Sequence, residues 1–283
     1  YWPDAEIDFG FFKGRADARM MNTICFDAFV PGNHEFDDGD ATLKAFLDEL
    51  AQGDCRTPTV SANIVPQAGT PLAPAGAPPY LLPSVVKTIG GVRVGIVGIT
   101  IADKTRASSR PLPSTQFLDE TRSAQAAIDA LGAQGVRHIV LLTHHGFDAD
   151  RALVGRLRGV DVVIGGDSHT LLGDFKALGV PAGGRYPTVL RNADGDAVCV
   201  GQAWEYAKAF GLMKVTFDAE GRVSRCDGQA ALVIGEPFKR KDAAGTWQPM
   251  APAEGEALKA RLATQPAVRV VAPDPAAAQT LAA

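Results

Sequence analysis

Residues 31–37 read PGNHEFD and follow an apolar run, and they hold several side chains that could do chemistry. Asn33 can offer an amide oxygen to a metal ion. His34 can protonate a leaving alkoxide or stabilise charge on a phosphate, and a nearby carboxylate such as Asp37 can hold its ring. The alternative is an ordinary turn, in which Gly32 supplies permissive backbone geometry and the acids are solvated.

Two further turns carry histidine and aspartate, LTHHG at 142–146 and GGDSHT at 165–170. Each follows a short apolar run that is typical of a buried strand. Because parallel strands end at the same edge of a sheet, His144, Asp167 and His169 can meet there as nitrogen and oxygen ligands of a metal ion. Four of the five histidines of the chain fall in these three turns, which favours a shared site over chance.

The elements that would position these turns alternate between strand-like and helical patterns, which predicts an α/β layered domain. The expected elements are strands at 92–99, 138–142 and 161–164, and helices at 119–131 and 150–157. From 197 to 233 the pattern predicts a second, antiparallel sheet with a hairpin turn at 217–221. Residues 66–79 and 178–187 are predicted surface loops, and the Ala- and Pro-rich residues 265–283 are predicted to begin an interdomain linker.

Composition narrows the class of protein. The chain has 283 residues, of which 46% are hydrophobic and 21% charged, so it can bury one large core or two modest ones. Its formal net charge of −4 gives no general attraction for nucleic acid or an anionic membrane, so a phosphate substrate would need local cations such as metal ions. No stretch approaches the roughly 20 apolar residues that span a bilayer.

The four cysteines include no CxxC pair, which argues against a zinc knot or a thioredoxin-like site. Cys199 and Cys226 lie in or beside successive strand-like runs and could pair in an oxidising compartment; the alternative is that they are small buried side chains. The basic segment 104–110 is predicted to be a solvated loop. Three aromatic residues are predicted to belong to the core and not to a ligand stack: Trp204, Tyr206 and Phe210.

The chain resembles the calcineurin-like metallophosphoesterase domain of the 5′-nucleotidase and UDP-sugar hydrolase family. The resemblance covers nearly the whole chain and rests on segments in the family's order: GNHEFD, SANI, GGVRVGIVGIT, LTHHG, GVDVVIGGDSHTLLGD, RYPTVLRN and VGQAWEYAKAFGLMKVTFDAEG. The GGDSHTLLGD and QAWEYA segments are closest to a bacterial periplasmic branch that includes NAD nucleotidases. The family implies a four-layer α-β-β-α sandwich with mixed sheets. Here the sandwich would occupy residues 1–264 and lack its first strands, with 265–283 leading to an absent C-terminal nucleotide-binding domain.

The resemblance also implies two divalent metal ions, such as Zn²⁺ or Mn²⁺, bridged by a carboxylate and a hydroxide that attacks phosphorus in line. It implies that His34 stabilises the transition state and that Asp37 orients it. The implied metal ligands are Asn33, His144, Asp167 and His169. The family usually has His at the position of Asp167, so the site would carry one more negative charge or lose that ligand. The family's Asp-x-His and Gly-Asp motifs do not precede residues 12–17, so about half of the ligands are expected here.

The implied function is metal-dependent hydrolysis of nucleotide phosphate esters or pyrophosphates, with nucleoside 5′-monophosphates and NAD as favoured substrates. The resemblance implies a periplasmic or secreted protein with a small-molecule nucleotide as its partner, and the chain itself is expected to be inactive. One alternative is a dimanganese hydrolase of sulfur oxidation that acts on a protein-bound thiosulfate adduct. Another is a degenerate, non-catalytic binding domain.

Overall fold

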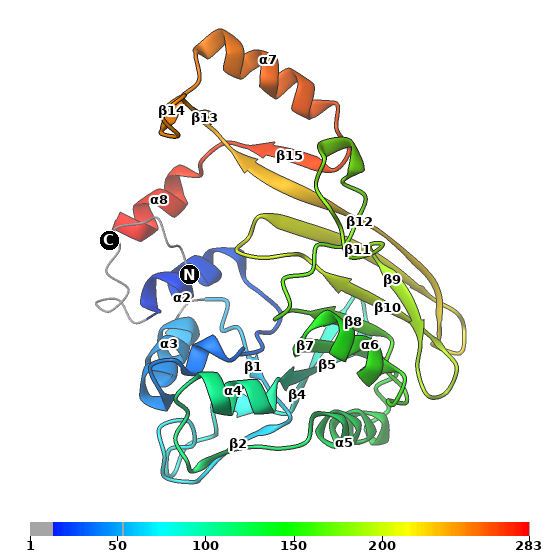
Figure 1. The fold of residues 1–283 in the computed structure, drawn as a ribbon. Coiled ribbons are helices and arrows are strands. Elements are labelled where there is room, and N and C mark those ends of the chain that lie inside the picture. Colours follow the sequence, from blue (N-terminus) through cyan, green and yellow to red (C-terminus); the bar gives the residue numbers. More distant parts are fainter. Residues whose placement is uncertain (1–13, 53, 283) are drawn as a thin grey trace.

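The computed structural model describes residues 14–52 and 54–282 of the chain (Figure 1). A six-stranded sheet lies at its centre, in the order β4-β5-β7-β8-β10-β9. Its strands are β4 (Ser84–Ile89), β5 (Val92–Thr100), β7 (His138–His144), β8 (Val162–Gly165), β9 (Thr188–Arg191) and β10 (Ala197–Gln202). The four central strands are parallel, and β4 and β9 are antiparallel edge strands. The central strands therefore deliver their carboxyl ends to one edge.

Two helices connect the central strands, α5 (Glu120–Ala133) and α6 (Phe147–Val154). The side chain of Asp119 caps α5 by accepting a hydrogen bond from the Arg122 amide at 2.8 Å. Small and aliphatic side chains recur on one face of α5 and pack on the sheet, because their spacing follows the helical repeat: Ala124, Ala127, Ile128 and Leu131. The predicted strands at 92–99, 138–142 and 161–164 are confirmed, as is the helix at 119–131; α6 begins three residues before the predicted start.

A second sheet has the order β11-β12-β15 and consists of β11 (Ala209–Phe217), β12 (Val223–Gly235) and β15 (Val268–Val271). Successive side chains of a strand point to opposite faces of a sheet. Val198 and Val200 of β10 belong to the core cluster under α5, whereas Cys199 between them forms a disulfide with Cys226 of β12. The second sheet thus lies on the face of the first sheet opposite α5, which gives the layered arrangement expected from the resemblance.

Two predictions about secondary structure are wrong. β10 belongs to the first sheet, where it pairs in parallel with β8, although its residues were expected to join the second sheet. It is buried on both faces, which is why its apolar run is continuous and typical of a central strand. Residues of the predicted basic loop form helix α4 (Ala102–Ser108), whose buried Ala102 and Thr105 are three positions apart beneath an exposed charged surface.

Residues 265–283, which are predicted to begin a linker, contain β15 and helix α8 (Pro275–Ala282). β15 pairs in parallel with β12, and α8 lies against α2 (Arg15–Ile24), as Figure 1 shows. The expected boundary at residue 264 therefore falls just before a strand of the second sheet, and the linker stays a prediction.

The remaining described elements are short, apart from α3 and α7. They are η1 (His34–Phe36), α3 (Asp40–Gln52), β1 (Thr59–Val60), β2 (Ile64–Pro66), β3 (Leu81–Leu82), β6 (Thr115–Phe117), η2 (Lys176–Leu178), β13 (Lys239–Lys241), β14 (Trp247–Pro249) and α7 (Pro252–Ala263). A second disulfide joins Cys25 to Cys55. Within the described ranges, no helix combines the length and apolar character needed to cross a bilayer.

Candidate metal and phosphate site

Three of the four predicted metal ligands meet at the carboxyl edge of the first sheet. Asn33 Oδ1 lies 3.1 Å from His144 Nε2, and Asp167 Oδ1 lies 3.3 Å from the same nitrogen. Donor atoms that share one ion at about 2.1 Å are separated by about 3.0 to 3.4 Å in octahedral or tetrahedral geometry. The two separations therefore fit a single divalent cation bound by an amide oxygen, an imidazole nitrogen and a carboxylate oxygen.

Other side chains are candidate metal ligands only where they cluster in the structure. Among residues 14–52 and 54–282, no group of three or more His, Cys, Asp or Glu side chains is arranged to hold a metal ion. The three residues described above contain only two side chains of those types, because their third donor is the amide of Asn33. We refer to Asn33, His144 and Asp167 as the ligand trio.

Close packing fixes the turn at residues 31–37, the first turn of the site, against strand β7. Asn33 is 1% exposed, and a Cβ added at Gly32 would lie 2.6 Å from the His144 ring, so only glycine fits there without a shift. Phe36, inside the same motif, is fully buried in the core cluster around α3. The burial of this aromatic side chain anchors the turn in the core. A turn that was merely solvated would have no such anchor.

A buried hydrogen-bond network ties the same turn to the end of β5. Asn63 Nδ2 donates to the Thr100 carbonyl at 2.7 Å, and Asn63 Oδ1 accepts from the Thr100 amide at 3.0 Å. The Thr100 hydroxyl donates to the Pro31 carbonyl at 2.8 Å. The SANI segment thus serves the site indirectly, by fixing the strand end on which the turn rests.

Gln202, at the end of β10, holds the turn that carries Asp167. Its Nε2 donates to the Gly166 carbonyl at 2.9 Å, and its Oε1 accepts from the Thr170 amide and from Ser168 Oγ. A buried side chain that satisfies groups on both sides of a turn restricts its backbone. Asp167 itself has a φ of 74°, in the left-handed region, and is held there by these contacts.

The fourth predicted ligand, His169, does not contact the trio. Its Nδ1 lies 3.1 Å from Glu205 Oε2, and its ring packs edge-on against Tyr206 with 5.3 Å between centroids. Lys208 also contacts Glu205 at 2.7 Å, and this hydrogen bond lowers the pKa of the Glu205 carboxyl. Glu205 and Lys208 were not predicted from the sequence, although both lie in the QAWEYAK segment that carries the resemblance.

Backbone strain concentrates around His169. Seven non-glycine residues in the described part of the chain have positive φ, and five of them lie in the two turns at this edge: Asp167, His169, Trp204, Tyr206 and Ala207. Such conformations persist where surrounding contacts enforce them, and they cluster at functional sites. The prediction that the aromatic residues belong to the core is wrong for Tyr206, which is 49% exposed, and for Phe210, which is 42% exposed at an outward position of β11. Trp204 does pack against a core cluster.

His34 and Asp37, the predicted catalytic pair, are in direct contact. His34 Nδ1 lies 2.7 Å from Asp37 Oδ2 across one turn of 3₁₀ helix. The His34 side chain is 76% exposed, so its remaining ring nitrogen is accessible. The carboxylate engages Nδ1 and leaves Nε2 exposed.

Helix α4 contributes two contacts that the sequence did not suggest. Lys104 Nζ contacts Asp167 Oδ1, and Ser108 Oγ accepts a hydrogen bond from Asn33 Nδ2 at 3.4 Å. The basic segment is therefore not merely a solvated loop. The Lys104 ammonium offsets the additional negative charge that an aspartate brings to this position.

Burial sets the protonation of the site. It lowers the pKa of His144, against the opposing effect of Asp167, and so favours the neutral imidazole that binds metal ions. Burial raises the pKa of Glu35, whose Oε2 accepts from the Gly32 amide at 2.5 Å. His145, the second histidine of its turn, faces Asp150 at 3.4 Å and not the ligand trio.

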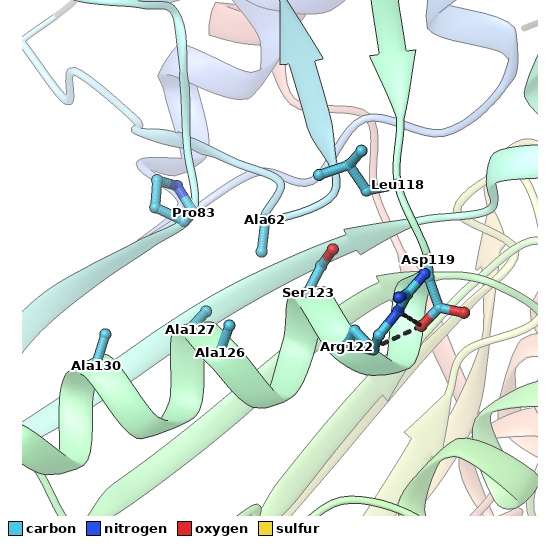
Figure 2. Close-up of a pocket in the computed structure, with 9 residues that line it drawn as sticks. All are labelled: Ala62, Pro83, Leu118, Asp119, Arg122, Ser123, Ala126, Ala127 and Ala130. Carbon is cyan, nitrogen blue, oxygen red and sulfur yellow. Dashed lines mark hydrogen bonds and ion pairs between the residues drawn. The ribbon is translucent and has the colours of Figure 1, made fainter.

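A separate groove of about 600 Å³ runs along α5 (Figure 2). Its lining residues are Ala62, Pro83, Leu118, Asp119, Arg122, Ser123, Ala126, Ala127 and Ala130. None of the predicted site residues is among them, so the groove is not part of the candidate site.

No protein-family model matches the chain. It is 36% identical over 260 residues to a probable 5′-nucleotidase of Treponema pallidum, an alignment that covers 91% of the chain and 42% of that protein. Among solved structures, the NAD nucleotidase of Haemophilus influenzae has a TM-score of 0.85 at 29% identity, covering 97% of the chain and 47% of that protein.

A 5′-nucleotidase precursor from Thermus thermophilus has a TM-score of 0.72 at 39% identity, covering 91% of the chain and 48% of that protein. A sulfate thiohydrolase from the same organism has a TM-score of 0.58 at 21% identity, which shows a shared fold alone. The chain spans slightly less than half the length of the relatives described here.

Proposed function

We propose, from the premise that this chain belongs to the 5′-nucleotidase family and has its calcineurin-like phosphoesterase fold, that the protein hydrolyses phosphate esters or pyrophosphates of nucleotides. The observation that carries the proposal is the meeting of Asn33 Oδ1, His144 Nε2 and Asp167 Oδ1 next to the exposed His34. Relatives described as 5′-nucleotidase and NAD nucleotidase support nucleoside 5′-monophosphates and NAD as the substrates.

In this proposal the ligand trio holds one divalent ion, and His169 belongs to a second. Bound ions would polarise the phosphate and supply a nucleophile at neutral pH. His34 contributes its accessible Nε2, which holds or transfers a proton at the leaving oxygen, while Asp37 fixes the ring through Nδ1. Lys104 keeps the added carboxylate from repelling the anionic substrate.

The alternatives receive less support. A dimanganese hydrolase of sulfur oxidation rests on a neighbour that shares the fold alone. A degenerate binding domain would have no need to preserve the contacts among the trio and between His34 and Asp37. We also propose a periplasmic or secreted location, since both pairs of cysteines form disulfides, which persist in oxidising compartments.

Metal content tests the proposal. The purified chain is equilibrated with Mn²⁺ or Zn²⁺ and bound metal is measured by elemental mass spectrometry, with His144→Ala as the variant and His138→Ala, outside the site, as the control. We expect at least one ion per chain, lost in His144→Ala and retained in His138→Ala. The longest form of the protein that carries this chain is then assayed for phosphate release from AMP and for cleavage of NAD. Equal metal binding by both folded variants would contradict the site, and hydrolysis of thiosulfate adducts without nucleotide cleavage would favour the first alternative.

A further inference from the structure

A serine just beyond helix α4 completes a chain of three side chains that ends at His34. Ser109 Oγ donates a hydrogen bond to Asp37 Oδ1 at 2.7 Å, and Asp37 Oδ2 lies 2.7 Å from His34 Nδ1. Each carboxylate oxygen of Asp37 thus has one partner. The mechanism above assigns no role to Ser109, which is 72 positions from Asp37 in the sequence.

The backbone around Ser109 is fixed to the turn that carries His34. The Arg110 amide donates to the Phe36 carbonyl at 2.9 Å, inside the 3₁₀ turn itself. The Leu112 amide donates to Oδ1 of the buried Asp40 at 2.8 Å, and the Thr115 hydroxyl contacts the other oxygen of Asp40. The serine hydroxyl is therefore presented to Asp37 from a segment that cannot move independently of it.

The exposure of Asp37 explains why such a contact would matter. Its side chain is 47% exposed, and an exposed ion pair holds two side chains in one geometry only weakly, because water competes and rotamer freedom is lost. A charge-assisted hydrogen bond from a fixed hydroxyl opposes rotation of the carboxylate toward water. Asp37 then faces His34 in one orientation, and the ring keeps its Nδ1 engaged.

We propose that Ser109 is a positioning residue for the His34–Asp37 pair. It holds the carboxylate, and the carboxylate in turn fixes the tautomer and direction of the imidazole. The catalytic consequence rests on the proposed function, whereas the positional consequence depends only on the contacts described above.

The first test needs no activity. The ¹⁵N and ¹H signals of the His34 imidazole are recorded at a single alkaline pH where the ring is neutral, and they are assigned with His34→Gln. In the unmodified chain we expect one tautomer, protonated at Nδ1. Ser109→Ala should shift the signals toward a mixture of both tautomers. Ser109→Thr, which keeps the hydroxyl, should restore the single tautomer, and Ser123→Ala on α5 should not change it. A single unchanged tautomer in folded Ser109→Ala would overturn the inference.

The second test separates leaving groups in the longest active form. With a nucleoside monophosphate, whose alkoxide leaving group needs a proton, we expect Ser109→Ala to lower kcat about tenfold and leave KM unchanged. With p-nitrophenyl phosphate, whose leaving group needs no proton, the loss should be less than twofold. Equal losses with both substrates would contradict action through His34. If the unmodified protein cleaves no nucleotide, the proposed function fails, and the imidazole spectrum still decides the role of Ser109.

Discussion

Lys104 and Asp167 are 63 positions apart in the chain, yet the ammonium contacts the carboxylate at the candidate site. A neutral histidine, which the resemblance implies at position 167, would need no such partner. With aspartate there, the Lys104 ammonium keeps the local charge close to that of a neutral side chain. Substituting one side chain of this pair therefore changes the charge of the site as well as its shape.

A carboxyl remote from the site gives a prediction about pH. Asp161 precedes β8, and its Oδ2 accepts from the Ile139 amide at 2.8 Å; burial raises the pKa of Asp161 to about 7, from 3.8. The folded protein therefore binds more protons than the unfolded chain between these values. The contribution of Asp161 to the free energy of unfolding is fully present below about pH 4 and is lost as the pH rises through about 7.

We expect Asp161→Asn to flatten this dependence. Between pH 5 and pH 8 the unmodified chain should lose on the order of 1 to 3 kcal/mol of unfolding free energy through this group, and the variant should not. Denaturant unfolding at both pH values measures the difference, with Asp148→Asn, on a fully exposed side chain, as the control. Parallel pH profiles for the unmodified chain and Asp161→Asn would contradict the assignment.

Single residues were predictable where a motif carried them. His34, Asp37 and the ligand trio each lie in a turn whose residue types suggest their chemistry, and the structure brings His34 to Asp37 and the trio together. Lys104 and Ser109 lie in the segment predicted to be a solvated loop, and Glu205 lies in a segment of the resemblance, but no sequence spacing brings these three residues to the site. Their contacts arise only when a helix or a crossing segment packs against the site.

At the scale of elements, the central strands were predictable because burial on both faces makes them continuous apolar runs. Helix α4 was not, since its seven residues include two basic side chains and its buried face is only two residues wide. The sheet membership of β10 was also missed. Nothing in a short apolar run specifies which neighbour it pairs with, and the long-range contact to β8 decides that.

The approach of the first turn to the end of β7 gives an element-scale prediction. Gly32→Ala places a methyl group 2.6 to 2.7 Å from the His144 imidazole, so the turn and the strand end must separate. We expect metal affinity to fall at least tenfold and unfolding free energy to fall by about 1 to 3 kcal/mol. Isothermal titration with Mn²⁺ and chemical denaturation measure the two effects.

Gly132→Ala is the matched control for Gly32→Ala. It lies in helix α5, where an added Cβ would have no atom within 4 Å. It should leave metal affinity unchanged and stabilise the chain slightly, since alanine favours helix more than glycine does. Unchanged metal affinity in Gly32→Ala would show that the turn can yield without disturbing His144.

At the scale of the whole molecule, the disulfide between Cys199 and Cys226 joins the two sheets. It connects β10 to β12 across the interface and closes a loop with a sequence separation of 27. We expect its removal, in a Cys199→Ala/Cys226→Ala variant, to lower the free energy of unfolding by about 3 kcal/mol. The reason is that the cross-link reduces the conformational entropy of the unfolded chain, and the variant regains that entropy. Denaturation of both forms measures this, and added reductant should destabilise the unmodified chain more than the variant, which keeps only the Cys25–Cys55 disulfide. An unchanged midpoint for the variant would mean that packing alone holds the sheets together.

The chain passes from the first sheet to the second through residues 203–208, beside His169. Three of these residues have left-handed backbone conformations, so the crossing stores strain where two layers and the site meet. Strained surface segments open at a lower free energy than a packed core does. Warming should therefore disorder this crossing while the sheets stay intact. The temperature at which the site loses its geometry would then be lower than the temperature at which the fold melts.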